Sequence, residues 1–270
     1  ISYLAGQKSV LNQSSYSSVE ELKAAGLNMQ METVVEEIDT KNKRLFYRRV
    51  NSKKTKLALY DKLIFATGSY PAMTSVPFDK KSKLYFLKSM DDAIKTDEFL
   101  KTAKNIAVIG GGMTGVEVAR IAQERGIQTT LIHRNKNLLN DYLDEPASHL
   151  LESWMNAEGM RLLLNTEVTE IGFDEENTII QTANGQKITV DGVIFTIGFR
   201  PNSYLLNQQV ELGDSGAVIV DEYMQTTCPD VFAVGDVSTT YVNLLEKSYY
   251  LPHASDAVRD GEIAAINLLA

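Results

Sequence analysis

The chain lacks several features that would define other classes of protein. Cys228 is its only cysteine, which excludes an intramolecular disulfide and any zinc site built from several cysteines. No apolar stretch approaches the roughly 18–20 residues that cross a bilayer, and no secretory signal opens the chain, although it begins on Ile1 and not on Met. The net charge of −8 lacks the basic excess of a general nucleic-acid binder. We expect a cytoplasmic protein with no metal, membrane or nucleic-acid partner.

The composition is that of a globular protein, and a glycine motif lies near the middle of the 270 residues of the chain. Hydrophobic residues make up 44% and charged residues 23%, which is the profile of a soluble globular protein, and the length is enough for one large domain or two ordinary ones. Ile106–Ile109 has the length of a buried parallel strand. Three glycines follow it with GxGxxG spacing, at Gly110, Gly112 and Gly115. Because a helical pattern (Val116–Gln123) and a second strand (Thr129–Ile132) come next, the segment predicts a dinucleotide-binding unit. The alternative is a purely structural glycine turn.

The residues after the second strand bear on which dinucleotide binds. An acid that binds the adenosine ribose of NAD normally ends this strand. Here His133 stands in that place, with Arg134 and Lys136 beside it. A carboxylate would repel a ribose 2′-phosphate, whereas an arginine can bind one, so the sequence favours NADPH. The alternative is that the three residues are only solvated loop charges.

An internal repeat explains why the motif begins so late. The segment DKLIFATG (Asp61–Gly68) matches DGVIFTIG (Asp191–Gly198), a proline follows each, and alternating strands precede each. We interpret the chain as two copies of one unit: a βαβ core, a β-meander and a returning strand. Gly110 lies 81 residues before Asp191 (191 − 110), and the same offset from Asp61 falls near position −20 (61 − 81). The first copy is therefore expected to have its glycine loop before Ile1, and the chain to be a fragment or a variant that lacks its first βαβ.

These motifs, in this order, resemble the FAD-dependent pyridine nucleotide–disulfide oxidoreductases, in the branch of NADH oxidase, NADH peroxidase and CoA-disulfide reductase. The matching segments are YDKLIFATGSYP, IGFRPN, TTCPDVFAVGD and LPHASDAVRDGEIAAINL. The resemblance implies FAD and NAD(P)H as cofactors, hydride transfer to the flavin, and oxygen, peroxide or a disulfide as acceptor. It also implies a homodimeric parent with a further C-terminal domain. An ungapped alignment puts the redox cysteine just before Ile1, whereas a gapped one puts Gly6 in its place.

The resemblance also assigns candidate site residues. Gly235 and Asp236 follow an apolar strand and are expected to bind FAD, unless Asp236 only caps a turn. Glu117, expected in the first helical turn, is the candidate catalytic residue near nicotinamide and flavin, with helix-dipole stabilisation as the alternative. Met113 replaces an aromatic residue that often gates the nicotinamide pocket. The remaining expected cofactor contacts are Thr114 in the glycine loop, Gly198 near the nicotinamide, and Ala66, Thr67 and Gly68 near the FAD adenosine.

The predicted fold class is α/β. A Rossmann-like NAD(P)H domain (residues 105–221) is inserted in a partial FAD domain (residues 1–104 and 222–270), and each carries a small β-meander. The predicted function is an FAD-dependent NAD(P)H oxidoreductase with a small-molecule electron acceptor, and we expect this chain by itself to bind FAD weakly and to be inactive. One alternative is a ferredoxin-reductase-like flavoprotein without a redox cysteine. The other is a non-catalytic nucleotide-binding remnant.

Overall fold

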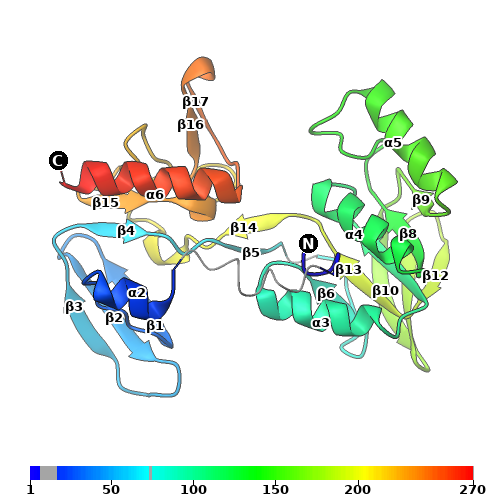
Figure 1. The fold of residues 1–270 in the computed structure, drawn as a ribbon, viewed down its shortest axis with the longest axis horizontal. Coiled ribbons are helices and arrows are strands. Elements are labelled where there is room, and N and C mark those ends of the chain that lie inside the picture. Colours follow the sequence, from blue (N-terminus) through cyan, green and yellow to red (C-terminus); the bar gives the residue numbers. More distant parts are fainter. Residues whose placement is uncertain (7–16, 73–74, 270) are drawn as a thin grey trace. The chain divides into compact units, whose positions relative to one another are not determined.

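The structure, a computed structural model, describes residues 1–6, 17–72 and 75–269 and forms two compact units (Figure 1). Unit 1 comprises the described residues of Ile1–Tyr16 and Pro71–Gly198. Unit 2 comprises those of Ser17–Tyr70 and Phe199–Ala270. Among the described residues, no helix is both long and apolar enough to cross a membrane.

Unit 1 is built on a five-stranded parallel sheet with the order β6-β13-β7-β8-β9. The strands of the whole unit are β6 (Leu84–Phe86), β7 (Asn105–Ile109), β8 (Gln128–Ile132), β9 (Arg161–Leu163), β10 (Val168–Asp174), β11 (Asn177–Thr182), β12 (Lys187–Val190) and β13 (Gly192–Phe195). Its helices are α3 (Met90–Leu100), α4 (Met113–Glu124) and α5 (Glu145–Ala157). Strands β10, β11 and β12 form a separate antiparallel meander.

The central strand β7 is buried on both faces because its side chains alternate between two cores. Ile106 and Val108 are fully buried with residues of α4, which packs on one face. Ala107 and Ile109 belong to the other core, which contains Ile171 and Ile180 of the meander. The Gly110 turn therefore leaves a strand whose direction is set by packing on both sides.

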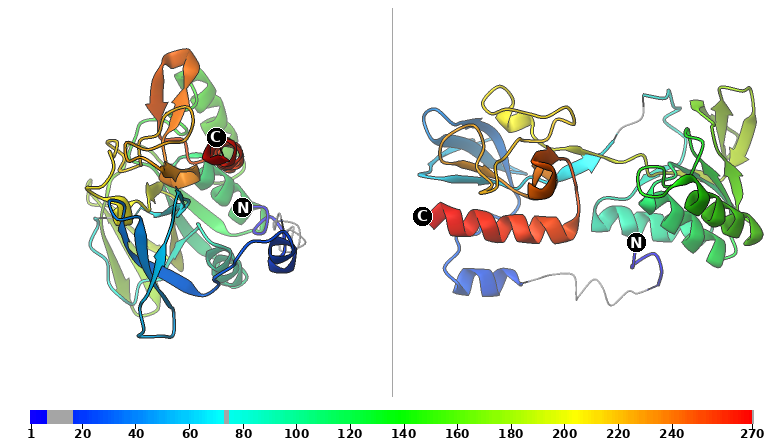
Figure 2. Two further views of the ribbon diagram at one scale, coloured as in Figure 1. Left: turned by 90° about the vertical axis from the view of Figure 1, so that its left-hand side faces the viewer. Right: turned by 90° about the horizontal axis from the view of Figure 1, so that it is seen from above.

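Unit 2 repeats part of this plan. Its strands are β1 (Thr33–Asp39), β2 (Arg44–Arg49), β3 (Lys56–Leu59), β4 (Leu63–Phe65), β5 (Ser69–Pro71), β14 (Phe199–Pro201), β15 (Val231–Ala233), β16 (Thr240–Val242) and β17 (Lys247–Tyr249). Its helices are α2 (Val19–Ala24), α6 (Ala254–Leu269) and the 3-10 turns η1 (Tyr204–Leu206), η2 (Gly235–Val237) and η3 (Asn243–Leu245). Helix α6, seen at full length in Figure 2, places Ala264 in a core with Phe65 of β4 and Phe232 of β15.

The internal repeat is confirmed at the level of strands. Strands β1, β2 and β3 form an antiparallel meander in chain order, as β10, β11 and β12 do. The strand after each meander is parallel to a neighbour in its own unit: β13 pairs with β7, and β4 pairs with β15. The second copy therefore interrupts the first, as the sequence predicts.

The expected boundaries at residues 105 and 221 differ from those of the compact units. Unit 1 begins its long segment at Pro71 and ends it at Gly198. The reason is that β6 pairs in parallel with β13, which brings β6 and α3 into the parallel sheet. After Gly198, the buried residues Val218 and Val220 join the core of unit 2.

Candidate functional site

The glycine loop between β7 and α4 has three positions where the backbone is crowded. A Cβ at Gly110 would lie 2.5 Å from the carbonyl oxygen of Thr196, and Gly110 has a φ of +116° that favours glycine. A Cβ at Gly115 would lie 1.8 Å from the carbonyl oxygen of Gly110, and one at Gly111 would lie 2.5 Å from Leu138 Cδ2. These glycines are needed for packing of the loop on its neighbours.

Gly112 differs, because a Cβ there would meet nothing within 4 Å. It is the N-cap of α4, with a φ of −78°, and no side chain caps the helix. The helix therefore begins without a side-chain cap, and uncapped N–H groups at the positive end of a helix can bind a phosphate. Met113 is 42% exposed at this end, and Thr114 is half-buried.

Thr196 supports the loop from β13 and was missed in the sequence. Its hydroxyl lies 2.9 Å from the carbonyl oxygen of Gly110 and 3.1 Å from that of Ile109. Its backbone N–H also donates to Ile109. In the sequence, Thr196 is only the residue that follows the apolar run in DGVIFTIG. Nothing in the sequence indicates that this strand lies beside β7.

Glu117 lies in the second turn of α4, so its expected place in the first turn is wrong. Gly112 adopts an extended conformation and allows the helix to begin at Met113, earlier than the apolar pattern from Val116 indicated. The side chain of Glu117 is exposed. Its position near the nicotinamide and flavin stays a prediction.

The three basic candidates after β8 differ in their contacts. Both ring nitrogens of His133 have partners: Nδ1 accepts from the N–H of Gly111 at 3.1 Å, and Nε2 lies 3.1 Å from Asn140 Oδ1. Lys136 Nζ lies 2.5 Å from Glu145 Oε1, and this carboxylate raises the pKa of Lys136. Arg134 is exposed, and no described residue forms a hydrogen bond or ion pair with its guanidinium.

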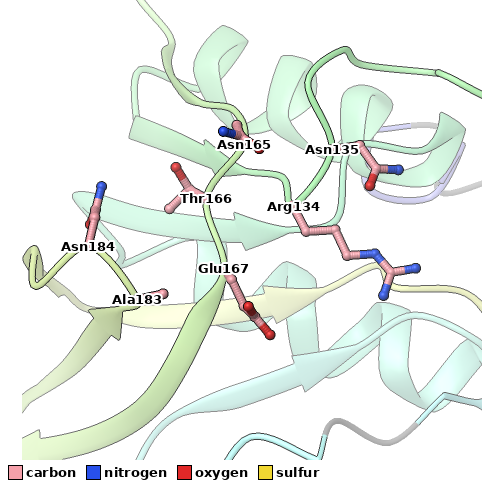
Figure 3. Close-up of a pocket in the computed structure, with 7 residues that line it drawn as sticks. All are labelled: Arg134, Asn135, Asn165, Thr166, Glu167, Ala183 and Asn184. Atoms are coloured by element: carbon pink, nitrogen blue, oxygen red, sulfur yellow. The ribbon is translucent and has the colours of Figure 1, made fainter.

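Arg134 also lines a hollow of about 550 Å³ in unit 1 (Figure 3). Three short segments form its wall: Arg134 and Asn135 after β8, residues 165–167 before β10, and residues 183–184 between β11 and β12. Figure 3 shows polar side chains on each segment, among them the amides of Asn165 and Asn184 and the carboxylate of Glu167. The wall thus offers hydrogen-bond donors and acceptors with one cation and one anion.

A second glycine turn, in unit 2, presents Asp236. Gly235 has a φ of +70°, and a Cβ there would lie 3.2 Å from that of Ala257 on α6. Asp236 Oδ2 accepts from the hydroxyl of Ser69 at 2.8 Å. Tyr250 lies nearby: burial, followed by the charge of Asp236, raises its pKa to about 12. The turn therefore holds a carboxylate at the end of β15.

Asp260 on α6 is a buried carboxyl that the sequence did not single out. It is 1% exposed, its Oδ2 accepts from the N–H of Gly235 at 3.3 Å, and its Oδ1 has no partner among the described residues. Burial raises its pKa, against the smaller lowering effect of the Gly235 hydrogen bond. Only the structure shows that this polar residue lies on the buried, apolar face of α6.

The segment after β4 and its counterpart after β13 end in glycines with positive φ. Gly68 has a φ of +67° and Gly198 a φ of +98°. Ala66 and Thr67 are exposed, and the Thr67 hydroxyl donates to the carbonyl of Asn202 at 2.8 Å. The N–H of Asn202 donates in turn to Gly68 at 2.9 Å. These two hydrogen bonds connect the ATG segment to the chain that follows β14. The contacts of this segment with a cofactor stay a prediction.

One unit has a parallel sheet with an uncapped helix N-terminus at its glycine loop, and the other has its own glycine–aspartate turn. These features are typical of a dinucleotide-binding flavoprotein fold. The model of the pyridine nucleotide-disulphide oxidoreductase family matches residues 2–261, and the chain belongs to this family. Two similar proteins are the NADH oxidases of Enterococcus faecalis and Lactococcus lactis, at 35% and 36% identity. Each match covers 94% of this chain and 57% of the relative. The chain thus spans little more than half the length of those relatives.

Solved structures agree. The water-forming NADH oxidase of Lactobacillus brevis bound to NADH has a TM-score of 0.95 at 32% identity, over 99% of this chain and 59% of that one. A mutant of that enzyme, engineered as an NADPH oxidase and bound to NADPH, has the same TM-score, identity and coverage. Its substitutions include an aspartate changed to alanine with the next alanine changed to arginine. The expected fold class and family are confirmed.

Proposed function

We propose that this chain is the cofactor-handling part of an FAD-dependent NAD(P)H oxidoreductase. The observation that carries the proposal is the uncapped N-terminus of α4 behind the open Gly112, in a unit separate from the Gly235–Asp236 turn. Two cofactors need two separate sites. The similarity to NADH oxidases over 94% of the chain supports this reading over a ferredoxin-reductase-like protein or a non-catalytic remnant.

Different residues would bind the dinucleotide and the flavin. The N–H groups of Met113 and Thr114 at the start of α4 would bind the dinucleotide pyrophosphate, with Gly112 leaving room for it. Asp236 would accept hydrogen bonds from flavin hydroxyl groups while Ser69 fixes its orientation. A flavin held there would supply the redox chemistry, for which the nicotinamide of the dinucleotide would be the hydride donor. The acceptor would be a small molecule, and oxygen is the first to test because two similar structures are water-forming oxidases.

We further propose that the dinucleotide is NADPH and that Arg134 alone sets this preference. Arg134 has no partner among the described residues, whereas His133 and Lys136 are engaged by Gly111 and Glu145. The engineered NADPH oxidase, in which an aspartate is removed and an arginine introduced next to it, supports the same pairing of residue types. One exposed charge-assisted hydrogen bond implies a preference of about 1–2 kcal/mol, or roughly 5- to 30-fold.

Titration of the 270-residue chain with NADPH and NADH at low salt tests the proposal. Arg134→Ala should weaken NADPH binding by roughly 5- to 30-fold and leave NADH binding nearly unchanged. Arg161→Ala, which removes another exposed arginine of unit 1, is the matched control and should change neither. Equal weakening of both dinucleotides by Arg134→Ala would mean that the arginine does not read the 2′-phosphate.

A further inference from the structure

Gly111 is the glycine of the loop that the GxGxxG spacing leaves out, and both of its backbone polar groups bind the segment after β8. Its N–H donates to His133 Nδ1 at 3.1 Å, and its carbonyl accepts from the N–H of Leu139 at 2.9 Å. A Cβ at Gly111 would lie 2.7 Å from His133 Cγ. The imidazole therefore lies directly against the loop, with no space between them.

The orientation of the ring follows from its partners. Because the N–H of Gly111 needs an acceptor, Nδ1 carries no proton, and we place the ring proton on Nε2, which faces Asn140 Oδ1 at 3.1 Å. Asn140 Oδ1 also accepts from Asn135 Nδ2 at 3.0 Å. The backbone of His133 is fixed as well: its N–H donates to Leu163, and its carbonyl accepts from Thr166, each at 2.9 Å.

We propose that His133 is a positioning residue that holds Gly111, and through it the glycine loop, in the shape that receives the dinucleotide pyrophosphate. Gly111 directly precedes Gly112, the N-cap of α4, so a shift of Gly111 moves the first N–H groups of the helix. A 2′-phosphate that bound His133 would have to displace Gly111 or Asn140 from the ring. His133 therefore supports NADH and NADPH binding equally, which separates its role from that of Arg134. This inference rests on the proposed function, since it presumes that unit 1 binds a dinucleotide.

Two substitutions of His133 distinguish a role in positioning the glycine loop from direct binding of the 2′-phosphate. In His133→Asn, the side-chain Oδ1 reaches the place of Nδ1 and can still accept from Gly111. In His133→Leu, the bulk stays and the acceptor is lost. His149→Leu is the control, because His149 is a 54% exposed histidine side chain of the same unit.

Binding of NADH and NADPH to the 270-residue chain is the first measurement. His133→Leu should weaken both dinucleotides by a similar factor of roughly 2- to 10-fold, the range for one hydrogen bond, and His133→Asn should restore most of the loss. His149→Leu should change neither. A loss confined to NADPH and shared by His133→Asn would show that the ring binds the 2′-phosphate, and would overturn the positioning role.

Amide hydrogen exchange at Gly111 in the nucleotide-free chain is the second measurement and needs no ligand. The Gly111 amide should exchange slowly in the unaltered chain and in His133→Asn, and several-fold faster in His133→Leu. Unchanged exchange in His133→Leu would overturn the positioning role whatever binds. Failure of the unaltered chain to bind either dinucleotide would instead overturn the proposed function, so the two failures can be told apart.

Discussion

Single residues in this protein acquire their roles from partners that are distant in sequence. Lys136 is a basic residue in a basic segment, yet its ammonium group is bound to Glu145 at the start of α5. The ring of His133, an expected cofactor contact, accepts a hydrogen bond from Gly111. The sequence predicted the cationic character of the segment but not which cation is free, because that depends on how the chain folds back from α5.

The ionisation of Asp260 should affect the stability of the protein. Burial raises its pKa above the unfolded value, so its contribution to stability is complete below the unfolded pKa of an aspartate and is lost as pH rises through the folded pKa. Asp260→Asn keeps an oxygen that can accept from Gly235 and removes the ionisation. We expect this variant to have a higher free energy of unfolding than the parent at pH 7, with the gain disappearing near pH 4.

Denaturant unfolding at the two pH values measures this difference. Glu262→Gln, an exposed carboxylate on the same helix, is the control and should show no such pH-dependent gain. If Asp260→Asn were destabilised to the same extent at both pH values, stability would not depend on the ionisation of Asp260 and the pH argument would fail.

At the scale of elements, most of the fold around the candidate site could be predicted from the sequence. The β7–α4–β8 unit, both meanders and the pairing of Asp61–Gly68 with Val231–Val234 follow from apolar periods, glycine spacing and the repeat. The errors concern short or weakly marked pieces. Strand β6 has only three residues, too few to show a pattern, and its partner β13 lies far along the chain. The start of α4 at Met113 is not evident from the sequence, because the glycines of the loop predict a turn there.

The glycine loop gives a paired test of packing against binding. Gly110→Ala would put a Cβ 2.5 Å from the backbone oxygen of Thr196 at a φ of +116°, so we expect a loss of about 2–4 kcal/mol in the free energy of unfolding. Gly112→Ala meets nothing within 4 Å at an ordinary φ and should cost less than about 1 kcal/mol. Its methyl group would fill the space proposed for the pyrophosphate, so NADPH binding should weaken by more than about tenfold.

Thermal unfolding and NADPH titration of both variants provide the comparison. Full binding by Gly112→Ala would mean that the open space beside this glycine is not where the dinucleotide lies. A stable Gly110→Ala would mean that the loop can move away from Thr196 at little cost, and that Gly110 is not required for the turn.

At the scale of the whole molecule, the order of the chain is not the order of its units. The described N-terminal residues 1–6 belong to unit 1, although Ser17–Tyr70 of unit 2 separates them from Pro71–Gly198. Leu4 is fully buried in the helix-covered core of unit 1, and its carbonyl accepts a hydrogen bond from Arg125. Arg125 also lies 2.7 Å from Asp97, which is 2% exposed. The repeat in the sequence could not predict this contact, because residues 1–6 carry no motif.

The contact predicts how unit 1 depends on the start of the chain. Residues 71–198 alone contain the complete parallel sheet and its three helices, so they should fold cooperatively, but with less stability than unit 1 has in the full chain. Leu4→Ala in the full chain should reproduce much of that loss, about 2–4 kcal/mol for a buried leucine, whereas Leu27→Ala, at a 49% exposed position, should change stability little. Thermal and denaturant unfolding followed by circular dichroism measure all three. If the 71–198 piece were unfolded, its sheet and helices would not be stable without the rest of the chain, and if Leu4→Ala had no effect, the first residues would not be part of its core.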